Sequence, residues 1–310
     1  MKALVTGAAG FIGSHLSAAL LDSGATVTGI DCFTDYYSRP LKEANLATVK
    51  GRPGFTFIED ALQRVDLTAL LDGVTHVFHL AGQPGVRKSW GADFDVYIRD
   101  NIEATQRLLE ALVRMPIQKY VYSSSSSVYG NNVPLPMRED TYLQPLSPYG
   151  VTKLAGEQLG NLYHANHGVP TVSLRYFTVY GPRQRPDMSF QRFLTAARDG
   201  TPITLYGDGE QTRDFTFVGD IVAANMAAAN QGRPGAVYNI GGGSRVSMNE
   251  VLALIQKVTG KTVNVKREPE QKGDMRHTYA DTSAARRDLD FRPQVSLENG
   301  LDQQYRWLTR

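Results

Sequence analysis

The stretch Gly7-Ala8-Ala9-Gly10-Phe11-Ile12-Gly13 decides the fold of this chain. It comes directly after the apolar segment Ala3-Leu4-Val5, which is typical of a strand, and directly before residues 15–21, which have helical spacing. At such a junction the first glycine permits a tight bend, the second lets the backbone approach a pyrophosphate, and the third lets the helix pack on the strand. The layout predicts a dinucleotide-binding turn, with the helix N-terminus facing the phosphates.

An acidic residue after this turn indicates which dinucleotide is bound. Residues 26–31 form a second predicted strand, and Asp31 ends it, 18 positions after Gly13. A carboxylate at this place accepts hydrogen bonds from ribose hydroxyls, and Cys32 and Phe33 stand beside it where an arginine would accommodate a 2′-phosphate. We therefore expect NAD rather than NADP.

Strand-like and helix-like segments alternate along the first part of the chain, which predicts a doubly wound parallel α/β sheet of at least six strands. After residue 31 the strand-like segments are 56–58, 74–80, 120–123 and 171–177, and the helix-like ones are 61–71, 102–113 and 154–163. After Gly181-Pro182 the pattern breaks into shorter pieces, among them 237–240. We expect an NAD-binding Rossmann domain over residues 1–180 and a smaller C-terminal α/β lobe over residues 181–310. Some crossing of the chain between the lobes is expected, with ligands in the crevice between them.

Composition argues against several classes of partner and site. In 310 residues, 33 basic side chains oppose 31 acidic ones, and a net charge of +2 gives no field that points to nucleic acid or an anionic membrane. Cys32 is the only cysteine, and the histidines lack companions in a metal-binding pattern, so we expect neither a disulfide nor a metal. We see no charged leader and no long apolar run, and expect a cytoplasmic protein without a membrane anchor.

Three groups of residues are candidates for catalysis and ligand binding in the expected crevice. Tyr149 and Lys153 are four positions apart, which puts a phenol and an ammonium on one helix face, where a cation lowers the pKa of the phenol. The serine run 123–127 follows an apolar strand at its carboxyl end. Four arginines offer the forked donors that suit a diphosphate, namely Arg185, Arg192, Arg213 and Arg276. Each group taken alone also fits an ordinary helix surface, a solvated loop or scattered surface charge.

Together these motifs resemble the extended short-chain dehydrogenase/reductase family, and within it the NAD-dependent nucleotide-sugar epimerases and dehydratases, over essentially the whole chain. Besides the glycine turn, the resemblance rests on Asp60, His79-Leu80-Ala81-Gly82, Asn101, Ser125 before Val128-Tyr129-Gly130, Tyr149 with Lys153, Leu174-Arg175-Tyr176-Phe177 and Tyr238-Asn239-Ile240-Gly241. It implies a tightly held NAD bound by Gly7, Gly10, Phe11, Ile12, Gly13, Asp31, Asp60, Ala61, Leu80, Ala81, Gly82, Asn101, Tyr149, Lys153 and Tyr176.

The resemblance also implies the roles of three catalytic residues. Tyr149 takes a proton from a sugar hydroxyl while hydride leaves the same carbon for NAD, Ser125 bonds the oxygen, and Lys153 tunes the phenol. In an epimerase the resulting keto sugar turns in the pocket and receives the hydride on its other face. A homodimer packed through two helices of each subunit, near residues 102–113 and 147–163, is implied as well.

Departures from the family pattern favour one branch. Related dehydratases place Asp and Glu after the catalytic serine, and sugar decarboxylases place Glu directly before Val-Tyr-Gly, whereas this chain has Ser126 and Ser127. UDP-galactose epimerases carry Asn where this chain has Thr178, and the stretches 175–182 and 185–188 resemble UDP-glucuronate 4-epimerases. The expected substrate pair is UDP-glucuronate and UDP-galacturonate. A UDP-glucose/UDP-galactose 4-epimerase, a decarboxylase and a non-catalytic NAD-binding regulator stay open as alternatives.

Small hydroxyls suit a uronic acid for a chemical reason. Oxidation at carbon 4 of glucuronate gives a ketone beta to the carboxylate, which loses carbon dioxide when the breaking bond aligns with the carbonyl orbitals. Our hypothesis is that hydrogen bonds from Ser126, Ser127 and Thr178 hold the carboxylate in an unreactive orientation. Arg87 is a further expected contact to the sugar, although tethering of the backbone explains this arginine equally well.

Overall fold

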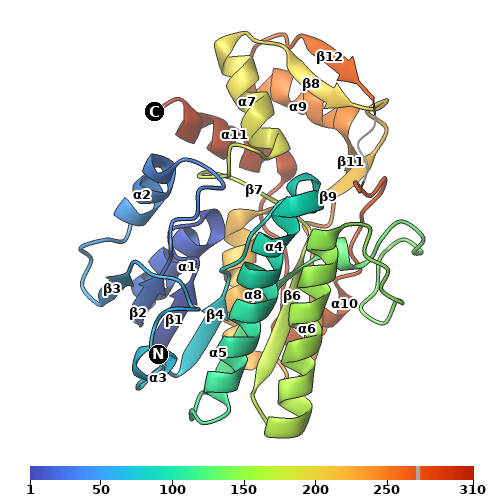
Figure 1. Ribbon diagram of the computed structural model, residues 1–310. Helices are drawn as coiled ribbons and strands as arrows, with labels where there is room; N and C mark the ends of the chain where they lie inside the picture. Colours follow the sequence, from blue (N-terminus) through green and yellow to red (C-terminus); the bar gives the residue numbers. More distant parts are fainter. Residues whose placement is uncertain (270–272) are drawn as a thin grey trace.

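Seven parallel strands form the central sheet of the protein (Figure 1). The computed structural model describes residues 1–269 and 273–310. In sheet order the strands are β10 (Ala236–Ile240), β6 (Thr171–Tyr176), β5 (Lys119–Ser125), β4 (His76–His79), β1 (Lys2–Thr6), β2 (Thr26–Ile30) and β3 (Phe55–Ile58). Every neighbouring pair in this order runs parallel. The expected doubly wound α/β sheet is confirmed.

The first strand shows why helices cover both faces of this sheet. Ala3 and Val5 are buried in one apolar cluster and Leu4 in another, because successive side chains of a strand point to opposite faces. The helices that complete the two clusters are α1 (Phe11–Asp22) and α8 (Val218–Gln231) on the first face, and α5 (Ala104–Leu112) and α6 (Pro148–His167) on the second.

The strand order places the glycine turn at the crevice of the sheet. Strand β1 pairs with β2 on one side and with β4 on the other, so the order of the strands reverses next to β1. Ligands of open α/β sheets bind at the carboxyl ends of the strands beside such a reversal. The turn that follows β1 therefore opens onto the expected binding crevice.

Smaller elements stand above the carboxyl ends of the strands (Figure 1). A three-stranded sheet contains β11 (Arg245–Ser247), β9 (Thr212–Phe217) and β7 (Thr178–Tyr180), and a two-stranded sheet contains β12 (Val265–Glu268) and β8 (Ile203–Tyr206). The helices of this part are α7 (Ser189–Asp199), α9 (Met248–Thr259) and α11 (Leu297–Leu308). Although α8 and β10 follow residue 181, they belong to the layers of the central sheet. The division into two lobes at residue 181 stays a prediction.

Short helices and turns connect the main elements. They are α2 (Arg39–Ala47), α3 (Leu67–Leu70), α4 (Phe94–Tyr97), α10 (Ser283–Leu289), the 3₁₀ turns η1 (Arg87–Ser89), η2 (Gly91–Asp93) and η4 (Ser126–Val128), and the π-helix η3 (Ile98–Glu103). Among the described residues no helix has both the length and the apolar character needed to cross a bilayer.

Three elements differ from the sequence prediction. The helix expected over 61–71 is a single turn, α3, which begins only at Leu67 because the Asp66 carboxylate caps it by accepting hydrogen bonds from the amides of Thr68 and Ala69. The helix expected over 102–113 begins earlier, as a π-helix. The segment 237–240, expected in the C-terminal lobe, lies in β10 and pairs with β6 as the seventh strand of the central sheet.

Candidate active site

The glycine turn forms the floor of a long pocket. Gly7 has a φ of +71°, and a Cβ atom there would lie 2.9 Å from the amide nitrogen of Ala81. A Cβ atom on Gly13 would lie 2.1 Å from the Gly7 carbonyl oxygen. Both positions therefore require glycine, and the start of α1 lies on the pocket, where a helix N-terminus suits a bound pyrophosphate.

Asp31 stands on the wall of the same pocket, directly after β2. Its Oδ2 accepts a hydrogen bond from the Ala9 amide at 3.1 Å, and its Oδ1 accepts one from the Phe33 amide at 2.9 Å. Burial raises the pKa of this carboxyl, while the two amides and the nearby Lys42 ammonium act in the opposite direction. Its remaining lone pairs suit the hydroxyl donors of a ribose.

The donors and acceptors of this pocket fit a dinucleotide. Two residues that line it, Tyr37 and Gln83, carry buried oxygen atoms without a hydrogen-bond partner in the described part of the chain: the Tyr37 hydroxyl and Gln83 Oε1. Buried polar atoms are rarely left unpaired, and a ligand with hydroxyl, amide and phosphate groups supplies partners for both. Together with the glycine cradle and Asp31, they match NAD.

Most residues predicted to bind the cofactor line this pocket, and one does not. Those on its surface are Gly7, Gly10, Phe11, Ile12, Gly13, Asp31, Asp60, Ala61, Leu80, Ala81, Gly82, Tyr149, Lys153 and Tyr176. Asn101 lies behind the surface, in the π-helix η3, where it pairs with both backbone groups of Gln83 and donates to the Thr152 hydroxyl at 2.9 Å. The role of Asn101 visible in the structure is to shape the loop after β4; a contact with the cofactor stays a prediction.

Helix α6 carries the predicted catalytic pair. The helix begins where the Ser147 hydroxyl accepts a hydrogen bond from the Gly150 amide and ends at Gly168, whose φ of +70° stops it. Tyr149 and Lys153 follow the cap on one face. The Lys153 ammonium donates to the Ser123 carbonyl oxygen at 2.9 Å, and burial lowers its pKa to about 8. The lysine thus anchors α6 to the end of β5.

Tyr149 lies where the cofactor pocket meets a second cavity of about 610 Å³. Its ring and that of Tyr97 pack in a T-shaped arrangement with 6.3 Å between centroids. Burial raises the pKa of the Tyr149 phenol, whereas the positive charge of Arg185 and a hydrogen bond with Ser125 lower it. The structure thus brings Ser125 and Tyr149 together, and a reacting group placed between the two cavities contacts both.

The predicted substrate residues line the second cavity. They are Arg87, Ser126, Ser127, Thr178, Arg185, Arg192, Arg213 and Arg276, with Ser125 beside them. The Ser125 hydroxyl accepts a hydrogen bond from the Ser127 amide at 3.1 Å and so caps the short turn η4. Five serines of β5 and η4 are therefore held at a carboxyl strand end next to Tyr149.

The profile of the NAD dependent epimerase/dehydratase family matches residues 3–241. The chain belongs to this family. It is 46% identical to the "Uncharacterized UDP-glucose epimerase YtcB" of Bacillus subtilis over 100% of this chain and 98% of the relative. It is 37% identical to a UDP-glucuronate 4-epimerase of Thermodesulfobacterium geofontis, over 98% of this chain and 95% of that one. The crystal structure of UDP-glucuronic acid 4-epimerase from Bacillus cereus with UDP-glucuronic acid and NAD is similar at a TM-score of 0.97 and 44% identity, over 100% and 99% of the chains.

The arginines of this family member occupy different parts of the cavity. Arg185 lies at the inner end near Tyr149, where its Nε and Nη2 donate to the Asp187 carboxylate at 2.9 and 3.0 Å. Arg87 donates to Asp274 at 2.7 Å and lies 4.4 Å from the centre of the Tyr206 ring. The visible partners of Arg87 are thus side chains of the C-terminal part, whereas backbone tethering was the alternative expected for it.

Sequence reasoning missed several residues of the two pockets. Tyr36 lies in both, donates to Asp187 at 3.2 Å, and has the Lys88 ammonium 4.9 Å from its ring centre. Lys42 lines the cofactor pocket and donates to the Thr34 hydroxyl at 3.2 Å. One signal was available: the pair Tyr36-Tyr37 follows Asp31 closely at the carboxyl end of a strand, where loops line the ligand.

Proposed function

We propose that the protein is an NAD-dependent UDP-glucuronate 4-epimerase, which interconverts UDP-glucuronate and UDP-galacturonate. The observation that carries the proposal is the set of three small hydroxyls, Ser126, Ser127 and Thr178, on the cavity that has Tyr149 at its inner end. The Bacillus cereus relative with bound UDP-glucuronic acid and NAD supports the same substrate.

The chain's own residues move one proton in the proposed reaction. NAD, when bound, accepts a hydride from carbon 4 of the sugar and later returns it. Tyr149 takes the proton of the hydroxyl on that carbon and gives it back in the second half of the cycle. Ser125 hydrogen-bonds the same oxygen, and the Lys153 ammonium favours the ionised phenol of Tyr149.

Neutral donors explain why the reaction stops at epimerisation. The 4-keto sugar carries a carboxylate beta to its ketone and decarboxylates when the bond between carbons 5 and 6 aligns with the carbonyl orbitals. Hydroxyls of Ser126, Ser127 and Thr178 hold the carboxylate away from that alignment while leaving its charge in place. A carboxylate side chain at position 127 would instead repel the substrate carboxylate from this orientation.

The cavity also offers cations for the diphosphate. Arg213 donates to the carbonyl oxygens of Thr212 and Arg276, and burial lowers the pKa of its guanidinium. Arg276 donates to Asp208 at 2.8 Å at the outer part of the same cavity. We assign Arg213 and Arg276 first, with Arg192 and Arg185 as further candidates, to the negative charges of a UDP-sugar.

A UDP-glucose/UDP-galactose 4-epimerase is the second candidate, because the Bacillus subtilis relative carries a UDP-glucose epimerase name. Tyr149, Ser125 and Lys153 would act in the same way on a neutral sugar. We further propose a homodimer formed through α5 and α6 and a cytoplasmic location. The exposed apolar side chains Val151 and Leu162 on α6 support the dimer.

The test is incubation of the purified protein with UDP-glucuronate, without added NAD, followed by proton NMR and by absorbance of reduced nicotinamide. We expect UDP-galacturonate to form to equilibrium without UDP-pentose and without accumulation of reduced cofactor. UDP-pentose as main product would identify a decarboxylase. Conversion of UDP-glucose to UDP-galactose, with UDP-glucuronate left unchanged, would favour the second candidate.

A further inference from the structure

A buried ion pair lies directly behind the catalytic residues. Glu157 follows Lys153 by one helical turn and Tyr149 by two, on the same side of α6. Its Oε1 accepts from Arg175 Nη2 at 2.5 Å and its Oε2 from Arg175 Nε at 3.1 Å. The side chains are 1% and 3% exposed. The pair therefore links α6, the helix on which Tyr149 lies, with β6 behind the site.

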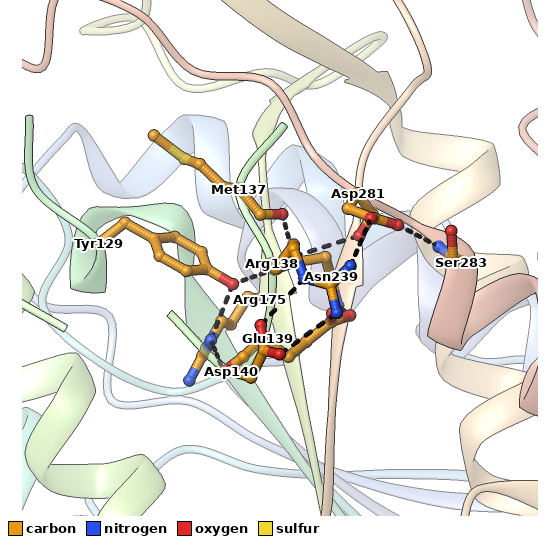
Figure 2. A network of polar contacts seen from close by, with 9 residues as sticks. All are labelled: Tyr129, Met137, Arg138, Glu139, Asp140, Arg175, Asn239, Asp281 and Ser283. Atoms are coloured by element: carbon orange, nitrogen blue, oxygen red, sulfur yellow. Dashed lines mark hydrogen bonds and ion pairs between the residues drawn. The ribbon is translucent and has the colours of Figure 1, made fainter. Parts of the chain in front are cut away.

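Hydrogen bonds extend from this pair to both ends of one short segment, residues 124–129. At its start, the Ser124 hydroxyl donates to Glu157 Oε2 at 2.8 Å. At its end, Arg175 Nη1 donates to the Tyr129 hydroxyl at 2.8 Å, and that hydroxyl donates to Asn239 Oδ1 at 2.8 Å (Figure 2). The segment between these two points contains Ser125 and two of the three carboxylate-binding hydroxyls proposed above, those of Ser126 and Ser127.

Stability alone does not account for such an arrangement. Replacement of a buried ion pair by well-packed apolar side chains is often neutral or stabilising, because two charges lose their hydration. A fully hydrogen-bonded network does fix geometry, and here it fixes the serine segment relative to the helix of Tyr149. Tyr129 itself lies outside both cavities, so an effect of Tyr129 on the substrate passes through the segment.

We propose that Glu157, Arg175 and Tyr129 are positioning residues that hold residues 124–129 in register with Tyr149, and thereby keep the uronate carboxylate out of the decarboxylating orientation. This inference rests on the proposed function. Decarboxylation of the 4-keto sugar breaks the bond between carbons 5 and 6. The electron pair passes into the ketone as an enolate, carbon dioxide leaves, and a proton adds to carbon 5. A loosened segment permits this step; a fixed one prevents it.

Tyr129→Phe tests the inference with a minimal change. It removes the hydroxyl and keeps the ring, while Arg175 Nη1 retains the Glu139 carbonyl oxygen at 3.2 Å. Tyr163→Phe is the matched control, because Tyr163 is also buried and its hydroxyl also has two partners, Glu110 and Gln106, far along α6 from the site. Proton NMR gives the ratio of decarboxylated product to UDP-galacturonate for each variant, and kinetics give kcat and KM.

We expect Tyr129→Phe to raise that product ratio by about tenfold or more and to lower kcat with little change in KM, since small displacements of positioning groups cost rate rather than binding. Tyr163→Phe should keep the wild-type ratio. A merely structural role of Tyr129 would lower the melting temperature and leave the product ratio unchanged. If Tyr129→Phe does not fold, Arg175→Lys provides the same test, because it keeps the positive charge opposite Glu157 and removes the forked donors of the guanidinium group.

The inference is overturned if both tyrosine variants keep the wild-type ratio, or if both raise it equally. Failure of the proposed function is a separate result, because the wild type would then not epimerise UDP-glucuronate at all. In that case the two variants are compared on UDP-glucose. A kcat of Tyr129→Phe that equals that of Tyr163→Phe on this sugar overturns the positioning role, and a selectively reduced kcat supports it.

Discussion

At the scale of single residues, the proposed function makes the binding of a uronate sensitive to the charge at position 127. Ser127 lines the substrate cavity, and its amide donates to Ser125. Ser127→Glu places a carboxylate against the proposed substrate carboxylate, and like charges brought together at a binding site cost several kcal/mol. We expect KM for UDP-glucuronate to rise by about tenfold or more, where tenfold corresponds to about 1.4 kcal/mol.

Ser127→Gln is the control for this prediction, because it has nearly the same size without the charge. Steady-state kinetics on UDP-glucuronate and on UDP-glucose separate bulk from charge, because added bulk hinders both sugars, whereas an added negative charge repels only the carboxylate of UDP-glucuronate. An unchanged KM for UDP-glucuronate in Ser127→Glu, with no UDP-pentose formed, would disprove the carboxylate role of this segment.

The pair Tyr149 and Lys153 shows how far residue-level prediction reaches. Their spacing of four predicts a shared helix face, and the structure has both on the pocket wall. The spacing does not predict that the ammonium donates to the Ser123 carbonyl oxygen, or that burial lowers its pKa to about 8. Those properties depend on the packing of α6 against β5, which no local pattern contains.

At the scale of elements, the turn between β1 and α1 tolerates no side chain at its third glycine. Gly13→Ala would place Cβ 2.1 Å from the Gly7 carbonyl oxygen, so the turn must open. We expect the variant to purify with far less NAD per chain than the wild type. Gly160→Ala is the control, since a Cβ there meets nothing closer than 3.9 Å. The measurement is NAD released on acid denaturation; wild-type content in Gly13→Ala would contradict the prediction.

A histidine joins α1 to the loop after β7 and makes stability depend on pH. The Nε2 of His15 faces the Pro182 carbonyl oxygen at 2.9 Å, and Arg183 Nη2 lies 2.5 Å from its Nδ1. Burial and the charge of Arg183 lower the pKa of His15 from 6.5 to about 4. This folded-state pKa lies below the unfolded value. The contribution of His15 to the free energy of unfolding is therefore fully present above pH 6.5 and is lost as the pH falls toward 4.

Urea unfolding at about pH 7.5 and about pH 5 measures this contribution, which should be about 2 kcal/mol. The free energy of unfolding should fall less between the two pH values in His15→Gln than in the wild type. Equal differences in the two proteins would show that His15 does not titrate in this range.

Strand β10 shows which part of the fold the sequence could not supply. The glycine turn can be predicted locally, because the backbone geometry within seven consecutive residues requires glycine at fixed positions. By contrast, the place of 237–240 depends on pairing with β6, more than sixty positions earlier, and its apolar pattern fits either sheet. The network around Glu157 and Arg175 was missed for the same reason, since its members come from distant segments.

At the scale of the whole molecule, three exposed apolar residues lie on α6 and the adjoining η3. Val151 and Leu162 on α6 are 49% and 55% exposed, and Ile98 in the adjoining η3 is 42% exposed. Val151 and Leu162 are eleven positions apart, three helical turns, and so lie on the same side of α6. Helix α5 packs beside α6 (Figure 1). The proposed homodimer would bury this side of α6 together with α5.

Leu162→Glu therefore tests the assembly as a whole. A charge in the centre of an apolar interface loses its hydration when two subunits associate, so the variant should be a monomer at concentrations where the wild type is a dimer. Leu41→Glu is the control, because Leu41 is also exposed, at 44%, but lies on α2 away from this face. Sedimentation velocity distinguishes the states. A dimer in both variants, or a monomer in the wild type, would exclude α6 as the dimer interface.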